Sequence, residues 1–97
     1  MKIWDKELLD KYITKHYDAS TALQRWIDFV EEAEWKSHNE LKSDFPSADY
    51  IGNNRYVFNI RGNNYRLVTV VVFIGGILKI RFIGTHAEYD KINCRSI

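Results

Sequence analysis

The chain has 97 residues, of which 45% are hydrophobic and 14% aromatic. These values exclude a disordered tail, and the length allows one hydrophobic core, so we expect a single domain over residues 1–97. The longest apolar run, residues 67–78, contains a threonine and two glycines and falls short of the roughly 20 residues that a membrane helix needs. No signal peptide opens the sequence, which predicts a cytoplasmic protein with no membrane partner.

Charge is unevenly distributed along the chain, although the net charge is only +1. Residues 1–54 contain seven Lys or Arg against eleven Asp or Glu, a balance of −4, whereas residues 55–97 contain seven against two, a balance of +5. The acidic half is suited to solvent or a partner, and the basic half to a polyanion. Cys94 is the single cysteine, so we expect no internal disulfide, no zinc cage and no cysteine nucleophile.

The first half of the chain is predicted to be helical. Apolar residues at helical spacing indicate a helix over residues 4–16. Asp18-Ala19-Ser20 then offers the N-cap of a second helix, which ends near Glu34. A capping-box spacing predicts a short third helix over residues 38–43. We interpret the apolar stripes of these helices as core rather than as a ligand site.

The second half is predicted to form strands, because the apolar period changes from 3.6 to 2. The strands are Arg55–Arg61, Tyr65–Ile74 and Ile77–Ile83. Asn63-Asn64 and Gly75-Gly76 are interpreted as two-residue hairpin loops, since these residues tolerate positive φ. The expected fold class is therefore α+β: N-terminal helices packed on one face of a small twisted antiparallel sheet of about three strands, with a short C-terminal helix.

These loops imply a register that gives the sheet a core face and a basic face. In that register Arg61 lies opposite Arg66, and Val70 lies opposite Arg81. The core face collects nine apolar or aromatic side chains: Tyr56, Phe58, Ile60, Leu67, Val71, Phe73, Leu78, Ile80 and Phe82. The basic face collects four cations, one amide and three valines: Arg61, Arg66, Lys79, Arg81, Asn59, Val57, Val68 and Val70.

The four cations on one face have two explanations that the pattern leaves open. Like charges directly opposite each other destabilise a sheet unless an anion lies between them. The face is either solvated or paired with acidic side chains, or it binds phosphate groups, for which the planar guanidinium of arginine is suited.

Residues 84–90, Gly-Thr-His-Ala-Glu-Tyr-Asp, follow the last predicted strand. Thr85 and Glu88 have capping-box spacing, which gives Glu88 a structural explanation. His86 falls in the first turn of that helix, and Tyr89 is within reach of the same side. Histidine exchanges protons near neutral pH, as cleavage of RNA through its own 2′-hydroxyl requires. We interpret the two other histidines, His16 and His38, as ordinary surface or core residues.

Two specific motifs lie at residues 54–67 (Asn-Arg-Tyr-Val-Phe-Asn-Ile-Arg-Gly-Asn-Asn-Tyr-Arg-Leu) and residues 81–92 (Arg-Phe-Ile-Gly-Thr-His-Ala-Glu-Tyr-Asp-Lys-Ile). With the stretch from Glu34-Trp35-Lys36 through Leu41-Lys42 to Phe45-Pro46, they resemble HigB-type toxins of the RelE-like superfamily. The likeness covers roughly residues 20–93. It implies a compact α+β ribonuclease that cleaves mRNA, typically on the translating ribosome. Since His86, Tyr89 and the arginines could supply the chemistry without metal, we expect no cofactor. The likeness also implies a HigA-type helix-turn-helix antitoxin, through which alone the toxin contacts operator DNA.

The resemblance also implies roles for residues. An arginine at the position of Arg66 is proposed to hold the scissile phosphate, and His86 and Tyr89 are the other catalytic candidates. The expected RNA-binding residues are Arg61, Arg81, Lys79 and Asn59, and the secondary candidates are Glu88 and Lys42. Lysines that some relatives carry on the first strand are replaced here by Val57 and Asn59, which puts a lysine base in doubt.

Two other interpretations remain open. One is a module that binds nucleic acid with the basic face but does not cleave it, and the other is a partner-docking domain that uses the acidic helices. Neither needs His86 or Tyr89, so substitutions at these two residues separate them from the ribonuclease.

Overall fold

The structure is a computed structural model that describes residues 1–93 and 96–97. The predictions made for Cys94 lie outside the described residues. In chain order the elements are β1 (Lys2–Trp4), α1 (Glu7–Ile13), the 3₁₀ helix η1 (Tyr17–Ala19), α2 (Ser20–Glu32), α3 (His38–Asp44), β2 (Asp49–Tyr50), β3 (Arg55–Ile60), β4 (Tyr65–Val72), β5 (Ile77–Thr85) and α4 (His86–Asp90). The expected α+β class and the short C-terminal helix are confirmed.

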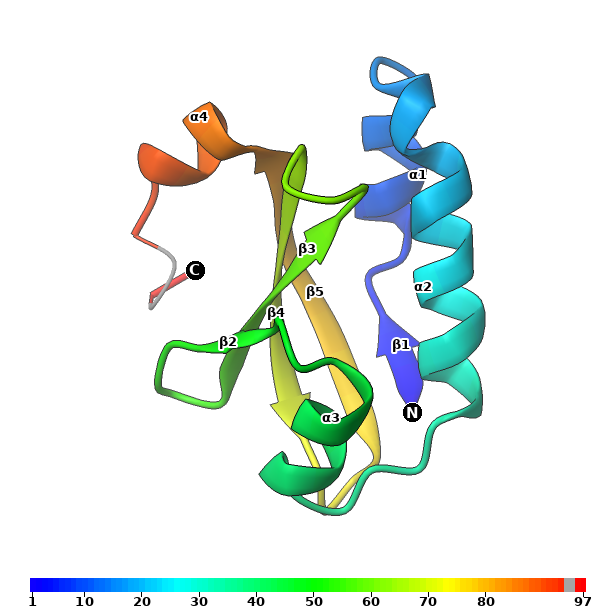
Figure 1. Ribbon diagram of the computed structural model, residues 1–97, viewed down its shortest axis with the longest axis vertical. Coiled ribbons are helices and arrows are strands. Elements are labelled where there is room, and N and C mark those ends of the chain that lie inside the picture. Colours follow the sequence, from blue (N-terminus) through cyan, green and yellow to red (C-terminus); the bar gives the residue numbers. More distant parts are fainter. Residues whose placement is uncertain (94–95) are drawn as a thin grey trace.

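A five-stranded sheet forms the centre of the molecule, in the order β1-β5-β4-β3-β2. Helices α1 and α2 lie on one side of it and α4 lies on the other (Figure 1). β1 runs parallel to β5, and the other neighbouring strands are antiparallel. The expectation of about three antiparallel strands is therefore wrong, both in strand number and in the direction of β1. Over the described part of the chain, no helix has the length and apolar character to cross a membrane.

The N-terminal strand explains why the first helix is shorter than predicted. Trp4 and Leu8 have helical spacing, but the chain turns between them at Asp5, whose φ is 67°. Trp4 pairs with Lys79 of β5, and α1 begins only at Glu7. A periodicity of apolar residues does not reveal such a turn, so the predicted helix wrongly included Trp4, the last residue of β1.

Helix α2 and the sheet build most of the core. Leu23, Trp26 and Val30 of α2 are buried. The Trp26 ring meets the Phe58 ring of β3 edge-on, with 5.3 Å between ring centres. The predicted second and third helices are confirmed as α2 and α3, nearly at their predicted ends.

Both hairpin loops are longer than predicted. The pairs Ile60–Tyr65 and Val72–Ile77 close loops of four residues, 61–64 and 73–76. In the first loop the positive φ angles belong to Arg61 (53°) and Gly62 (64°) rather than to the two asparagines. The expectation of two-residue loops was wrong because it assigned positive φ to the residues that most often adopt it.

The longer loops shift the register of both hairpins by two residues near the loops. Arg66 pairs with Asn59 instead of Arg61, and Val70 pairs with Lys79 instead of Arg81. A shift of two keeps each side chain on its expected face, because side chains alternate with a period of two. Arg61 is the exception, since it lies in the loop and leaves the sheet face.

A β-bulge in β5 changes the placement of two further residues. Thr69 pairs with Ile80 and Val68 pairs with Phe82, so Arg81 is an extra residue between them. Phe82 therefore falls in the row of Val68 on the face opposite α2, and its expected place in the core is wrong. The other residues predicted for the core face lie in the core or pack against it.

Candidate active site

Arg66 of β4 is the centre of a polar cluster on the sheet face opposite α2. Its Nη1 donates to Oδ1 of Asn59 at 3.0 Å, and its Nη2 donates to Oδ2 of Asp49 at 3.3 Å. Asn59 is its ladder partner on β3, and Asp49 belongs to β2. The guanidinium carbon lies 4.6 Å from the centre of the Tyr89 ring, which α4 supplies. Four elements thus meet at one arginine.

The Arg66 guanidinium is held in place but incompletely paired. Its side chain is 15% exposed, whereas that of Asp49 is 57% exposed. Within residues 1–93 and 96–97, the buried Nε has no hydrogen-bond partner. An ion pair to an exposed carboxylate is weak in water, so a phosphate oxygen can replace Asp49 on Nη2. The cluster is therefore suited to bind one phosphate group in a defined orientation.

Helix α4 is held on the end of β5 by a capping box, as predicted. The Thr85 hydroxyl accepts the Glu88 N–H at 3.2 Å, and the Glu88 carboxylate accepts the Thr85 N–H at 2.8 Å. Gly84 permits this close turn, because a Cβ there would lie 2.6 Å from Cζ of Phe82 and 3.0 Å from Cβ of Glu88. The local sequence therefore fixes where α4 starts and so where Tyr89 meets Arg66.

Glu88 has a second structural contact that the sequence did not reveal. Its Oε1 accepts a hydrogen bond from the Tyr12 hydroxyl at 3.0 Å, which ties α4 to α1. The Thr85 N–H, and then the Tyr12 hydroxyl, hold the pKa of Glu88 below its usual range. Burial and the bond to Glu88 raise the pKa of Tyr12. An ionised carboxylate with these partners is a poor proton donor, which favours the structural interpretation of Glu88. In the described ranges, no three His, Cys, Asp or Glu side chains are grouped to hold a metal ion.

His86 and Tyr89 lie on the same short helix but have different surroundings. His86 is the first residue of α4 and is exposed, and no described residue forms a hydrogen bond with its ring. Tyr89 is half-buried and contacts Arg66. Residues three apart are neighbours on a helix surface, so the sequence spacing places His86 next to Tyr89 on α4.

Two of the expected site residues are engaged elsewhere. Arg61 donates from Nη1 to Oδ2 of Asp18 at 2.6 Å, beside the Tyr65 hydroxyl, which donates to the same carboxylate at 2.6 Å. The Tyr65 bond, and then the charge of Arg61, lower the pKa of Asp18. Lys42 donates to the carbonyl oxygens of Pro46, at 2.9 Å, and Ala48. The geometry gives these cations structural contacts and brings neither of them to Arg66.

The other two expected cations lie on β5. Lys79 is on the same sheet face as Arg66 and is half-buried. Its ladder partners are Val70 of β4 and Trp4 of β1. Arg81 is the exposed bulge residue and lines a cleft against α1 rather than the Arg66 cluster. Of the RNA-binding candidates, Asn59 alone contacts Arg66.

Asp49 was not predicted as a site residue. It belongs to the two-residue strand β2, which is too short for a recognisable period. A signal was nevertheless present in Gly52-Asn53-Asn54, whose φ angles are 88°, 51° and 61°. Residues with positive φ are typical of the turn between two antiparallel strands. The turn comes just before β3, so it indicates a preceding partner strand, which is β2 with Asp49.

Comparison with known proteins identifies the family. Residues 19–92 match the model of the HigB_toxin family, described as the RelE-like toxic component of a toxin–antitoxin system. The chain belongs to this family. The mRNA interferase HigB of Escherichia coli O6:H1 strain CFT073 is 28% identical over 94 residues, which cover 95% of this chain and 91% of that relative. The mRNA interferase toxin HigB of Escherichia coli K12 and the mRNA interferase HigB of Shigella flexneri are each 32% identical over 93 residues, 93% of this chain and 88% of theirs. The resemblance to HigB-type toxins at residues 54–67 and 81–92 is thus confirmed.

The capping box of this HigB-family toxin can be tested through stability. We expect Thr85→Ala to lower the free energy of unfolding by about 1 kcal/mol, because the Glu88 N–H loses its acceptor. Thr85→Ser retains an oxygen at the same place and should unfold close to the unsubstituted protein. Urea denaturation of the three proteins measures the difference, and equal midpoints for Ala and Ser would show that the hydroxyl does not stabilise α4.

Proposed function

We propose that this HigB-family toxin is a metal-independent endoribonuclease that cleaves mRNA on the translating ribosome. The observation that carries the proposal is the Arg66 cluster, in which a guanidinium is oriented by Asn59 and Tyr89 beside the helix that begins with His86. The printed names of the relatives, mRNA interferase, support the same activity in this chain.

In the proposed reaction the RNA supplies its own nucleophile. The 2′-oxygen loses its proton and attacks the adjacent phosphorus, the bond from phosphorus to the 5′-oxygen breaks, and the 5′-oxygen takes up a proton. Arg66 binds the non-bridging oxygens, where negative charge grows in the transition state. His86 exchanges protons with the reacting oxygens, and the Tyr89 ring keeps the guanidinium in place. The products are a 2′,3′-cyclic phosphate and a 5′-hydroxyl.

The proposed partners follow from the family. A HigA-type helix-turn-helix antitoxin would neutralise the toxin, and operator DNA would be reached only through that antitoxin. Lys79, on the same sheet face as Arg66, would contact the RNA backbone. The proposed compartment is the cytoplasm, where mRNA and ribosomes are found.

The activity is tested with purified protein and an end-labelled RNA in the presence of a metal chelator. We expect fragments with 2′,3′-cyclic phosphate ends, and we expect expression without antitoxin to arrest growth while mRNA is lost. RNA that is bound but left intact, together with normal growth under strong induction, would favour a non-catalytic binding module instead. Ribosome dependence is measured by adding translating ribosomes to the same assay.

A further inference from the structure

A second cationic site lies between α1 and the edge of β5. It is a cleft of about 650 Å³, within the usual range for ligand sites. Leu8, Lys11, Tyr12 and Lys15 line it at the spacing i, i+3, i+4 and i+7, so one face of α1 and the turn after it supplies one wall. The opposite wall is the part of β5 beyond Lys79, where β1 has ended and the strand edge is open.

The charges of this cleft are not neutralised within the protein. Lys11, Lys15 and Arg81 line it, and none of the three has a side-chain hydrogen bond or ion pair within residues 1–93 and 96–97. By contrast, Arg61 and Arg66 are both paired with aspartates. Glu88 is the one carboxylate among the lining residues, and the Thr85 N–H and the Tyr12 hydroxyl already bind it. The cleft therefore offers three cations to an anion from outside.

Flat and apolar side chains lie between these cations. The His16 and Tyr12 rings are stacked, with 4.2 Å between their centres and 9° between their planes. Phe82, Ile83 and the part-exposed Leu8 complete the apolar lining. Cations that alternate with aromatic and apolar surface are typical of sites for single-stranded nucleic acid, where phosphates meet the charges and bases meet the rings.

The cleft lies close to the Arg66 cluster along β5. Gly84 is the ladder partner of Arg66 on β5, and the Phe82 ring lies against Gly84 while it also lines the cleft. Figure 1 shows the upper part of β5 between α1 and α4, the two helices that border the two sites. An RNA strand whose phosphate is held at Arg66 can therefore follow β5 into the cleft.

We propose that this cleft is a second RNA subsite, which binds phosphodiester groups of the strand beside the scissile one. The proposal rests on the function proposed above and adds a binding region to it. Lys11, Lys15 and Arg81 would bind the backbone, and the stacked His16–Tyr12 pair would support a base.

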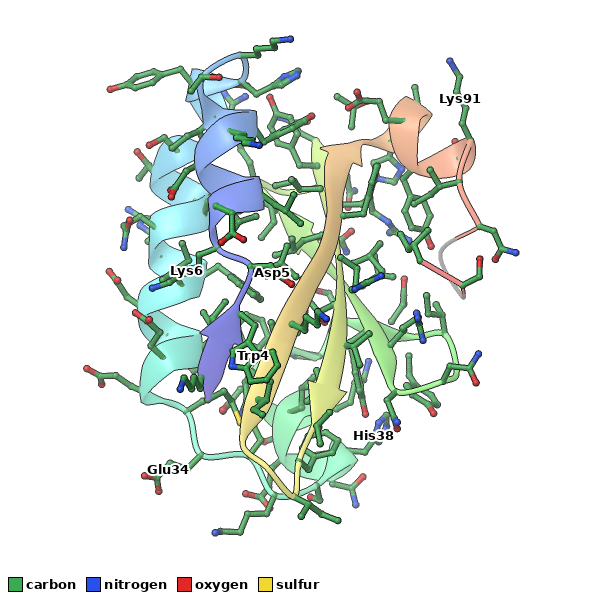
Figure 2. The ribbon with its side chains drawn as sticks, turned by 180° about the vertical axis from the view of Figure 1, so that it is seen from behind. Trp4, Asp5, Lys6, Glu34, His38 and Lys91 are labelled. Carbon is green, nitrogen blue, oxygen red and sulfur yellow. The ribbon has the colours of Figure 1, made fainter. Side chains whose placement is uncertain are left out.

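The test uses oligonucleotides with 2′-O-methyl groups, which cannot be cleaved through the 2′-oxygen. Fluorescence anisotropy compares lengths of about four and about twelve nucleotides at several salt concentrations. The cleft variant is Lys11→Gln with Lys15→Gln. The matched control is Lys2→Gln with Lys36→Gln, which removes two cations from a different cleft that also contains Glu34. In Figure 2 Glu34 lies at the lower end of the molecule, far from α4 at the upper end.

We expect the cleft variant to bind the longer oligonucleotide roughly ten-fold more weakly and to lose about 1.4 units of the salt slope, which corresponds to two phosphate contacts. The shorter oligonucleotide, held at Arg66, should bind both variants equally. A parallel arm with ribosomes that carry no mRNA identifies the source of the RNA. If the cleft variant binds both oligonucleotides normally but binds ribosomes more weakly, the cleft contacts phosphates of ribosomal RNA, and the proposal that it binds the cleaved strand is overturned.

Three outcomes separate the two proposals. If the cleft variant binds both lengths and the ribosome like the control, while the unsubstituted protein cleaves RNA, the subsite is wrong and the function stands. If the unsubstituted protein neither binds nor cleaves RNA, the proposed function itself fails. If the variant loses only its affinity for the antitoxin, the cleft is a protein-docking surface and the RNA subsite is overturned.

Discussion

Replacing Arg66 by alanine is expected to lower the single-turnover rate of RNA cleavage by about 10²–10³-fold. The fold orients this guanidinium from several sides, through Asn59, Asp49 and the Tyr89 ring. This orientation lowers the stability of the folded protein. Burying a charged guanidinium removes it from water, and its Nε has no hydrogen-bond partner among the described residues that would compensate. That cost is understandable if the charge is needed where the phosphate becomes more negative.

Arg66→Lys separates charge from geometry in the same assay. Lysine keeps the positive charge but has neither the planar fork nor the flat face that lies on Tyr89, so we expect it to restore only part of the rate. Arg25→Ala, which removes an exposed arginine from α2, is the control for loss of charge. Thermal unfolding confirms that each variant is folded. An Arg66→Ala protein that is folded and cleaves RNA at the unsubstituted rate would remove Arg66 from the reaction.

The faces of the sheet could be predicted from the sequence although the loops could not. Side chains on a strand alternate between the two faces, so a register that is wrong by two residues still places each side chain on the correct face. Asn59, Arg66 and Lys79 therefore lie on the expected face. Arg61 and Phe82 were assigned to the wrong place, because the alternating pattern does not predict the loop at Arg61 or the bulge before Phe82. A positive φ at an arginine is uncommon, and a bulge adds one residue without a change in composition.

The contacts of the site depended on elements that the sequence pattern did not show. The contact between Arg66 and Tyr89 joins two motifs that the sequence had already singled out, at residues 54–67 and 81–92. Asp49 belongs to a segment to which no element was assigned, and Tyr12 belongs to a helix interpreted as core, yet they hold Arg66 and Glu88. Single-sequence patterns identify which face a residue occupies, whereas its partner on another element follows from packing.

The acidic and basic halves of the chain meet in the fold, and acidic side chains pair with two cations that were predicted for the basic face, whereas phosphate binding stays a prediction. Asp18 and Asp49, from the acidic half, pair with Arg61 and Arg66. The unpaired cations of the cleft come from both halves, since Lys11 and Lys15 precede residue 55 and Arg81 follows it. Net charge by segment therefore predicted a polyanion partner but not the surface on which it would lie.

Replacing His86 by alanine is expected to lower the cleavage rate by about 10²–10⁴-fold, the usual contribution of a positioned acid or base. Glu88 is bound by Thr85 and Tyr12, and its pKa is lowered, so it is not a proton donor near neutral pH. Tyr89 lies with its ring on a guanidinium. Of the three candidates on α4, His86 has an exposed imidazole, and we propose that this ring exchanges the protons.

Two measurements make this assignment specific. Imidazole added to the His86→Ala protein should restore part of the rate, because it supplies the missing acid or base. Tyr89→Phe keeps the ring on Arg66 and removes only the hydroxyl, so its rate should stay near that of the unsubstituted protein. The reverse pattern, a slow Tyr89→Phe and a fast His86→Ala, would move the proton transfer to Tyr89 and leave His86 as a surface residue. Because both side chains project from α4, Thr85→Ala should slow either reaction by loosening the helix that presents them.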